Sequence, residues 1–189
     1  MNIAIYSGSF NPLHIGHLAI IKHMIEEAGF DMVYLIVSPK NPLKDGISAT
    51  TGQDRYNAAV EAVNRHFSGG KASKVKVDDI ELNMPEPHYT VRTLKALAER
   101  EPENTFTFVM GADNLADIRR WREYTTILKD FGVAVFPRTG HDLTQIKQDL
   151  LNEDPAYRIQ ILDAPLVDIS STQIREAIAN GNDPSKYLM

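Results

Sequence analysis

The stretch that decides the fold reads Gly8-Ser9-Phe10-Asn11-Pro12-Leu13-His14-Ile15-Gly16-His17. It follows an apolar segment at residues 2–7, turns at Gly8 and Pro12, and enters a segment of helical periodicity. A strand, a glycine turn and a helix in immediate succession are typical of a βαβ unit. We therefore expect the first strand and helix of a parallel sheet here.

The same alternation continues along the chain. We expect strands near 2–7, 32–37, 74–82, 105–110, 132–136 and 158–162. We expect helices near 15–28, 53–67, 90–101, 121–130, 142–152 and 171–180. No internal repeat, low-complexity tract or linker composition interrupts the 189 residues. This predicts one α/β domain over residues 1–189, with a doubly wound, mostly parallel sheet.

Composition and charge limit the kinds of partner that this chain can bind. The absence of cysteine excludes disulfides, thiolate metal sites and thiol nucleophiles. A net charge of −5 provides no positive field to hold a nucleic acid. The N-terminus lacks the basic leader of a signal peptide, and no apolar run approaches the roughly 18 residues that span a bilayer. These features predict a cytoplasmic enzyme without nucleic-acid or membrane contact.

Gly8 and the two histidines of this stretch indicate phosphate chemistry. Gly8 lets the backbone approach a ligand, and the helix start offers unpaired N–H groups and a partial positive charge. His14 and His17 are three residues apart, so both can donate to one phosphate during phosphoryl or nucleotidyl transfer. The alternative is that they only cap or pack the helix. Zinc is disfavoured because no third ligand accompanies them locally, and a missing G-x-G-x-x-G argues against a redox domain.

A second anion site is predicted at residues 170–175. Ser170 and Gln173 fit a capping box, so a helix should begin here, and its apolar residues, Ile178 included, should face the core. The hydroxyls and N–H groups of this helix start can bind an anion, and Arg175 adds a planar cation one turn in. For Ser170 alone, a plain cap explains the pattern equally well.

A third cluster follows the strand expected at 105–110. Gly111 at the strand end would let a ring or ribose pack on the backbone, and Asp113 could accept hydrogen bonds from ribose hydroxyls. Trp121 could stack on a planar ligand. Core packing is the alternative for a single tryptophan.

These three clusters together resemble a known family. G-S-F-N-P-L-H-I-G-H is similar to the signature of the H-x-G-H nucleotidyltransferase superfamily, and I-S-S-T-Q-I-R to the segment that grips the ATP phosphates there. G-A-D-N-L-x5-W resembles the nicotinate mononucleotide adenylyltransferase branch, in which the tryptophan stacks on the pyridine ring. The resemblance implies a Rossmann-like fold and transfer of AMP from ATP to nicotinate mononucleotide, with Mg²⁺ carried by ATP and pyrophosphate.

The resemblance also implies a set of site residues. The catalytic ones are His14, His17 and Arg175. Those expected to bind ATP are Gly8, Ser9, Phe10, His14, Gly16, His17, Gly111, Asp113, Ser171, Thr172 and Arg175. Those expected to bind the acceptor are Asn11, Lys44, Arg55, Tyr89, Thr90, Trp121 and Arg138, with a lesser role for Arg138. No protein ligand to a metal is expected.

The sequence departs from the family pattern at three places. Leu43 replaces the usual histidine of the P-x-x-P-P-H-K loop, and His88 replaces the usual serine of S-Y-T. Relatives usually continue through one more short helix beyond Leu188. Lys44 and Arg55 keep their places, although solvated surface charge is the default interpretation for both.

Other functions stay open at this stage. Phosphopantetheine adenylyltransferases resemble this chain but carry threonine at the position of His14 and lack the Gly111, Asp113 and Trp121 pattern. Cytidylyltransferases carry a different C-terminal motif. A non-catalytic nucleotide-binding domain would keep the glycines and the arginine without reacting. The sequence leaves open the choice between acid and amide mononucleotide, and also whether the chain forms a homo-oligomer.

Overall fold

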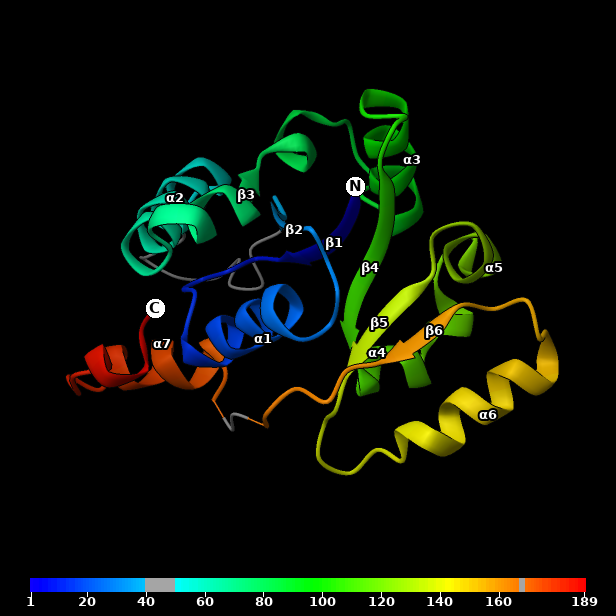
Figure 1. Ribbon diagram of the computed structural model, residues 1–189. Coiled ribbons are helices and arrows are strands. Elements are labelled where there is room, and N and C mark those ends of the chain that lie inside the picture. The colour runs from blue at the N-terminus through cyan, green and yellow to red at the C-terminus, as the bar shows by residue number, and fades with distance from the viewer. Residues whose placement is uncertain (40–49, 167–168) are drawn as a thin grey trace.

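The computed structural model describes residues 1–39, 50–166 and 169–189 and contains a six-stranded sheet covered by helices (Figure 1). The strands run in the order β3-β2-β1-β4-β5-β6, and all neighbours pair in parallel. The predicted doubly wound α/β fold is confirmed. The strand bounds are β1 (Asn2–Gly8), β2 (Met32–Val37), β3 (Val75–Asp78), β4 (Thr105–Gly111), β5 (Val133–Phe136) and β6 (Ile159–Ile161).

Helices pack on both faces because successive side chains of each strand point to opposite sides. In β1, Ala4 and Tyr6 belong to one apolar cluster, with residues of α1 and α2, whereas Ile3 and Ile5 belong to the other, with residues of α3, α4 and α6. The helix bounds are α1 (Ile15–Glu26), α2 (Gly52–His66), α3 (Thr90–Arg100), α4 (Ala112–Ala116), α5 (Tyr124–Thr126), α6 (Leu143–Glu153) and α7 (Ser171–Ala179).

Three expectations about these elements were wrong. The strand expected at 74–82 ends at Asp78, and a 3₁₀ turn, Ile80–Asn83, follows it. The helix expected at 121–130 is replaced by α5 and a π-helical turn, Ile127–Phe131. Ile178 is 54% exposed, because α7 turns only Ile174 fully into the protein.

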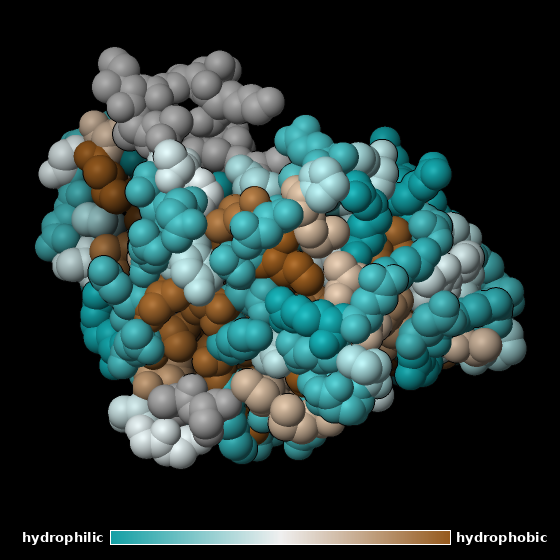
Figure 2. Space-filling view, turned by 90° about the horizontal axis from the view of Figure 1, so that it is seen from above, coloured by the Kyte–Doolittle hydropathy of each residue, from teal (hydrophilic) through white to brown (hydrophobic). Residues whose placement is uncertain are grey.

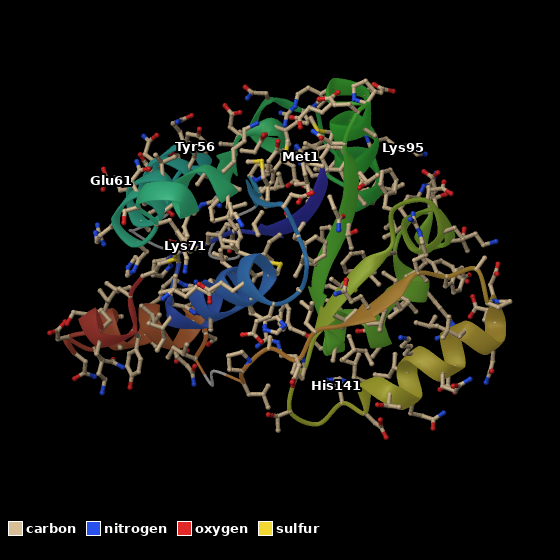
Figure 3. All side chains as sticks on the ribbon, viewed as in Figure 1. Met1, Tyr56, Glu61, Lys71, Lys95 and His141 are labelled. Carbon is tan, nitrogen blue, oxygen red and sulfur yellow. The ribbon has the colours of Figure 1, made fainter. Side chains whose placement is uncertain are left out.

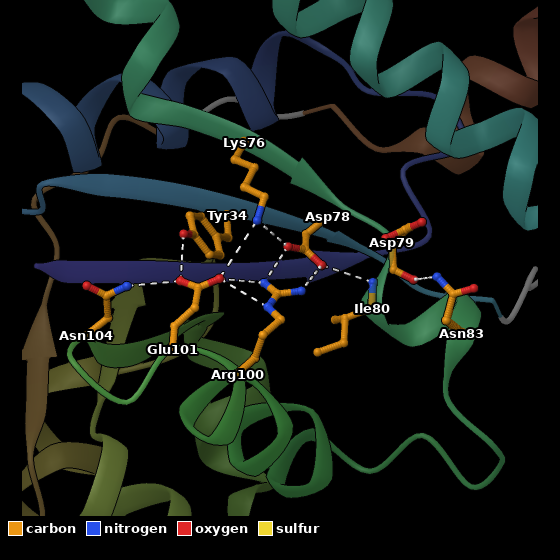
Figure 4. A network of polar contacts seen from close by, with 9 residues as sticks. All are labelled: Tyr34, Lys76, Asp78, Asp79, Ile80, Asn83, Arg100, Glu101 and Asn104. Carbon is orange, nitrogen blue, oxygen red and sulfur yellow. Dashed lines mark hydrogen bonds and ion pairs between the residues drawn. The ribbon is translucent and has the colours of Figure 1, made fainter.

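A polar network holds α3 against the sheet (Figure 4). Asp78 is almost fully buried and accepts from Arg100 Nη2 at 2.7 Å, from Lys76 at 3.0 Å and from the backbone N–H of Ile80 at 3.0 Å. Glu101 accepts from the Tyr34 hydroxyl at 2.9 Å. The network thus joins the end of β3 to the C-terminal end of α3, which carries Thr90 at its other end.

The outer surface is mainly hydrophilic. The face in Figure 2 shows apolar residues in patches between polar ones, and Figure 3 shows Glu61, Lys71 and Lys95 at the outside of the molecule. Within residues 1–39, 50–166 and 169–189, none of the helices has the length and apolar character needed to cross a membrane.

Candidate functional site

The topology places the candidate site between β1 and β4. The strand order reverses at this pair, so the connections leaving β1 and β4 diverge to opposite faces and leave a crevice beyond the carboxyl ends. Gly8 ends β1 and Gly111 ends β4. Both glycines border the same cavity, which brings the first and third sequence clusters together.

Two adjoining cavities occupy this crevice. The histidine cavity, of about 180 Å³, lies between the starts of α1 and α7. The strand-end cavity, of about 450 Å³, extends from Gly8 and Gly111 to Trp121. We call the residues that border both cavities the junction: Tyr6, His17, Phe136, Arg138 and Ser171.

His14 and His17 are held by the start of α1. His14 Nδ1 accepts the backbone N–H of Gly16 at 3.1 Å, and His17 Nδ1 accepts the backbone N–H of His14 at 3.1 Å. The capping role considered from the sequence is therefore real, but it uses one nitrogen of each ring. In the neutral ring the proton then lies on Nε2, which leaves a hydrogen-bond donor on each histidine.

Both rings are kept neutral by their surroundings. Burial, assisted by the nearby Arg138 charge, lowers the pKa of His14 to about 4. Burial also lowers the pKa of His17 well below its usual value, and the charges of His14 and Arg138 add to the effect. At neutral pH the pair therefore offers two uncharged donors.

The start of α7 closes the histidine cavity. Ser170 caps the helix through the predicted capping box, accepting the N–H of Gln173 at 3.2 Å. The Ser171 hydroxyl donates to the carbonyl of Pro12 at 2.9 Å, which ties α7 to the loop before α1. The N-terminal ends of the first and last helices thus meet above the sheet, although 159 positions separate Ser171 from Pro12.

Thr172 and Arg175 lie beside this meeting point, outside both cavities. They line a separate groove of about 500 Å³, together with Asn11. Arg175 donates to the Asn11 carbonyl at 2.7 Å and to the Thr172 hydroxyl at 3.0 Å, and its Nε is buried without a partner among the described residues. In this arrangement Arg175 supports the loop between β1 and α1 and borders neither of the two cavities.

Arg138 occupies a more central position than its sequence context indicates. It borders both cavities, its guanidinium lies 5.0 Å from the centroid of the Phe136 ring, and its Nε is 3.7 Å from Asp113 Oδ1. Gly111 makes this approach possible, because a Cβ there would lie 2.5 Å from Asp113 Oδ1 and 3.1 Å from Arg138 Nε. The glycine at the end of β4 is thus required by crowding.

Trp121 and the start of α3 form the far end of the strand-end cavity. Trp121 packs edge-on against Phe108, with ring centroids 5.9 Å apart, and still borders the cavity, so core packing and ligand contact are both available to it. Thr90 borders the same cavity, whereas Tyr89 borders a neighbouring one and is 45% exposed. Among the residues that the structure describes, no side chain caps α3 with a hydrogen bond.

Arg55 is buried, so the default interpretation as surface charge was wrong. Its side chain is 2% exposed, and Nη1 donates to the carbonyls of Ser9 and Ser38, each at 2.7 Å. These contacts join the loops that follow β1 and β2, and Arg55 positions those loops with its guanidinium directed at carbonyls. Lys44 and Leu43 lie outside the described residues.

The loop around Phe10 shapes the remaining wall. Phe10 is buried with φ of 45°, a left-handed conformation that is uncommon for a residue with a side chain. Its ring lies against Gly8, where a Cβ would approach Phe10 Cε1 to 3.1 Å. The glycine here leaves room for a neighbouring side chain as well as for a ligand.

Sequence reasoning missed Tyr6, Phe136 and Glu81 as cavity residues. Tyr6 and Phe136 belong to apolar strand patterns and carried no separate signal. Glu81 is 5% exposed, borders the strand-end cavity and accepts from the Thr93 hydroxyl at 2.8 Å. Its burial, which raises its pKa, depends on α3 packing over it and is invisible in the sequence.

Comparison with known proteins identifies the family of this chain. The model of the Cytidylyltransferase-like family matches residues 5–177. The probable nicotinate-nucleotide adenylyltransferase of Flavobacterium johnsoniae is 38% identical over 188 residues, covering 100% of this chain and 92% of that protein. The corresponding protein of Flavobacterium psychrophilum is 39% identical over 180 residues, covering 95% of this chain and 88% of that protein.

A solved structure is similar over nearly the whole length. Plasmodium falciparum nicotinic acid mononucleotide adenylyltransferase, complexed with NaAD, superimposes with a TM-score of 0.76 at 25% identity, covering 99% of this chain and 90% of that chain. Fold and sequence likeness therefore agree, and the chain belongs to the Cytidylyltransferase-like family, within its nicotinate-nucleotide adenylyltransferase branch.

Proposed function

We propose that this chain transfers AMP from ATP to nicotinate mononucleotide, forming deamido-NAD and pyrophosphate. The observation that carries the proposal is the junction of the two cavities, where His17, Arg138 and Ser171 border both spaces. Two nucleotides that occupy adjoining cavities bring their phosphates together at such a point. The names of the relatives and the complex of the P. falciparum enzyme support the same pair of substrates.

In the proposed reaction, an oxygen of the acceptor 5′-phosphate attacks the α-phosphorus of ATP. A new phosphorus–oxygen bond forms, the bond from the α-phosphorus to the oxygen bridging to the β-phosphorus breaks, and its electrons leave with pyrophosphate. The attacking oxygen is already anionic at neutral pH, so no general base is required. Catalysis then consists of alignment and of charge stabilisation by the Nε2–H groups of His14 and His17 and by Arg138.

Magnesium enters this reaction with the substrate. Among the described residues, no three His, Asp or Glu side chains gather in a way that could hold a metal ion. The family resemblance implies that Mg²⁺ arrives with ATP, and when bound there it would neutralise the charge that leaves with pyrophosphate. The residues around the junction contact those phosphates as donors.

The far end of the strand-end cavity favours the acid form of the acceptor. Trp121 borders the cavity as an aromatic surface for a pyridine ring, and Thr90, at the start of α3, borders the same cavity. A helix N-terminus without a side-chain cap attracts a negative charge. A ring carboxylate placed there is stabilised, whereas a neutral amide gains less.

A pyrophosphate-release assay tests this function. ATP is supplied with nicotinate mononucleotide, nicotinamide mononucleotide or phosphopantetheine, and we expect the highest kcat/KM with nicotinate mononucleotide. Faster turnover of phosphopantetheine would assign the chain to that activity instead. Tight ATP binding without pyrophosphate release from any of the three acceptors would identify a non-catalytic nucleotide-binding domain.

A further inference from the structure

Tyr6 is one of the junction residues. It lies near the end of β1, two residues before Gly8, and borders both cavities. Its ring is held by three neighbouring rings, with centroid distances of 5.6 Å to Phe10, 5.9 Å to His17 and 6.1 Å to Phe136. This packing fixes the ring and therefore the direction of its hydroxyl.

The hydroxyl of Tyr6 has no hydrogen-bond partner among the described residues. The side chain is more than nine-tenths buried, with 7% exposure, yet its oxygen is not sealed among protein atoms. A buried tyrosine hydroxyl ordinarily finds a partner. Tyr6 borders both cavities, so a group that enters them can supply the missing partner.

The surroundings keep this hydroxyl protonated. Burial raises the pKa of Tyr6 above its usual value, and the charge of Arg138 offsets only part of that effect. At neutral pH Tyr6 is a neutral donor beside a cation and a neutral histidine. Phosphate oxygens are the groups of both substrates that best accept from such a donor.

We propose that the Tyr6 hydroxyl is a catalytic donor that hydrogen-bonds the phosphate oxygens at the reaction centre. The proposal rests on the proposed function, because it assigns the junction to the phosphates of ATP and the acceptor. Charge shifts during the step from the attacking oxygen toward pyrophosphate, and a fixed donor at the junction stabilises the charge as it moves. Tyr6 keeps its proton throughout, so no proton transfer is added to the reaction.

Tyr6→Phe tests the proposal because it removes only the hydroxyl and keeps the ring packing. We expect kcat to fall on the order of 10²-fold, as for other preorganised donors, with a smaller change in KM. The matched control is Tyr34→Phe, which removes another buried tyrosine hydroxyl, one that donates to Glu101 far from the junction. The control should keep its kcat, although it loses a hydrogen bond.

The outcomes separate the two proposals. If the wild-type protein is active and the folded Tyr6→Phe variant has the same kcat, the role of Tyr6 is overturned. The proposed function is then unaffected. Equal losses of kcat in Tyr6→Phe and Tyr34→Phe also overturn it, because a general structural effect then explains both. Wild-type protein that releases no pyrophosphate overturns the proposed function and this inference with it.

A second measurement tests the proposal if the Tyr6→Phe variant does not fold. A fluorinated tyrosine incorporated at position 6 keeps the shape of the ring and makes the hydroxyl more acidic. Because burial raises the pKa of Tyr6, the wild-type hydroxyl stays protonated over the working pH range. Only the protonated hydroxyl donates, so we expect an alkaline fall of kcat to appear in the fluorinated protein, with Arg138 and His17 unchanged around it. A fluorinated protein whose kcat follows the wild-type pH profile would overturn the proposal.

Discussion

The imidazole rings of His14 and His17 stack on one another, with centroids 3.7 Å apart and planes 28° apart. Each ring also accepts a backbone N–H of the same helix start through Nδ1. Stacking and capping together fix the positions of both Nε2 atoms. A pair fixed in this way loses little side-chain entropy when it donates to a phosphate.

His17→Ala should remove a donor at the junction. We expect kcat for pyrophosphate release to fall by about 10²–10³, while the circular dichroism spectrum stays that of the wild type. Unfolding should be only slightly easier, since one cap contact is lost. His66→Ala, at an exposed position in the last turn of α2, serves as the control. A near-normal kcat for His17→Ala would contradict the assignment.

The buried histidines predict a loss of stability on mild acidification. His14 has a folded pKa of about 4, whereas a histidine in the unfolded chain titrates near 6.5, at about its model value. Below about pH 6.5, His14 therefore binds a proton in the unfolded chain but not in the folded chain. The free energy of unfolding falls as the pH approaches 4. Above about pH 6.5, the stability that is lost on acidification is fully present.

His14→Asn isolates that effect because asparagine keeps a good N-cap without titrating. Urea denaturation at about pH 7.5 and pH 5 should show a smaller drop in the free energy of unfolding for the variant than for the wild type. Equal drops would mean that His14 is not protonated on unfolding in this range.

Gly111→Ala should disturb the cavity wall by crowding alone. The added methyl would lie 2.5 Å from Asp113 Oδ1, while the φ of −80° suits alanine. We expect kcat/KM for ATP to fall by about tenfold or more, because Asp113 and Arg138 must move. Gly70→Ala, where the methyl lies within 4 Å of no atom of the described residues, should leave steady-state kinetics unchanged.

Trp121→Ala should weaken the binding of the acceptor and leave the binding of ATP unchanged. Stacking on an aromatic side chain contributes about 1–3 kcal/mol for a base, so KM for nicotinate mononucleotide should rise by about tenfold or more. Trp121→Phe keeps a ring beside Phe108 and should recover most of the loss. If Trp121→Ala raises KM for ATP and leaves KM for nicotinate mononucleotide unchanged, the tryptophan contacts ATP and not the acceptor.

Arg100→Met should destabilise the protein through Asp78. Burial pushes the pKa of Asp78 up, but hydrogen bonds from Arg100 and Lys76 outweigh it and leave the pKa lowered. Loss of Arg100 leaves a nearly buried carboxylate with fewer donors, and we expect about 2 kcal/mol less free energy of unfolding. Lys95→Met breaks an exposed pair with Glu123 and should cost less than about 1 kcal/mol. Urea denaturation at neutral pH compares the two variants.

Local patterns account for what the sequence by itself determined. The alternation of apolar strands and helices, the turn at Gly8, the capping box of Ser170 and the pairing of His14 with His17 all involve residues within a few positions of one another. Such contacts follow from backbone geometry and side-chain spacing. They were enough to predict the fold and the starts of the two helices that the structure brings together.

The tertiary structure alone decided which side chains reach the cavities. Arg55 is buried because carbonyls 46 and 17 positions away converge on it, and Arg175 bonds a carbonyl 164 positions away. β3 stops early because Asp78 turns to Arg100. In the sequence, Tyr6 is indistinguishable from the other apolar residues of its strand. Only the folded sheet places it beside the two cavities. These outcomes depend on packing between distant segments, whose register no local pattern specifies.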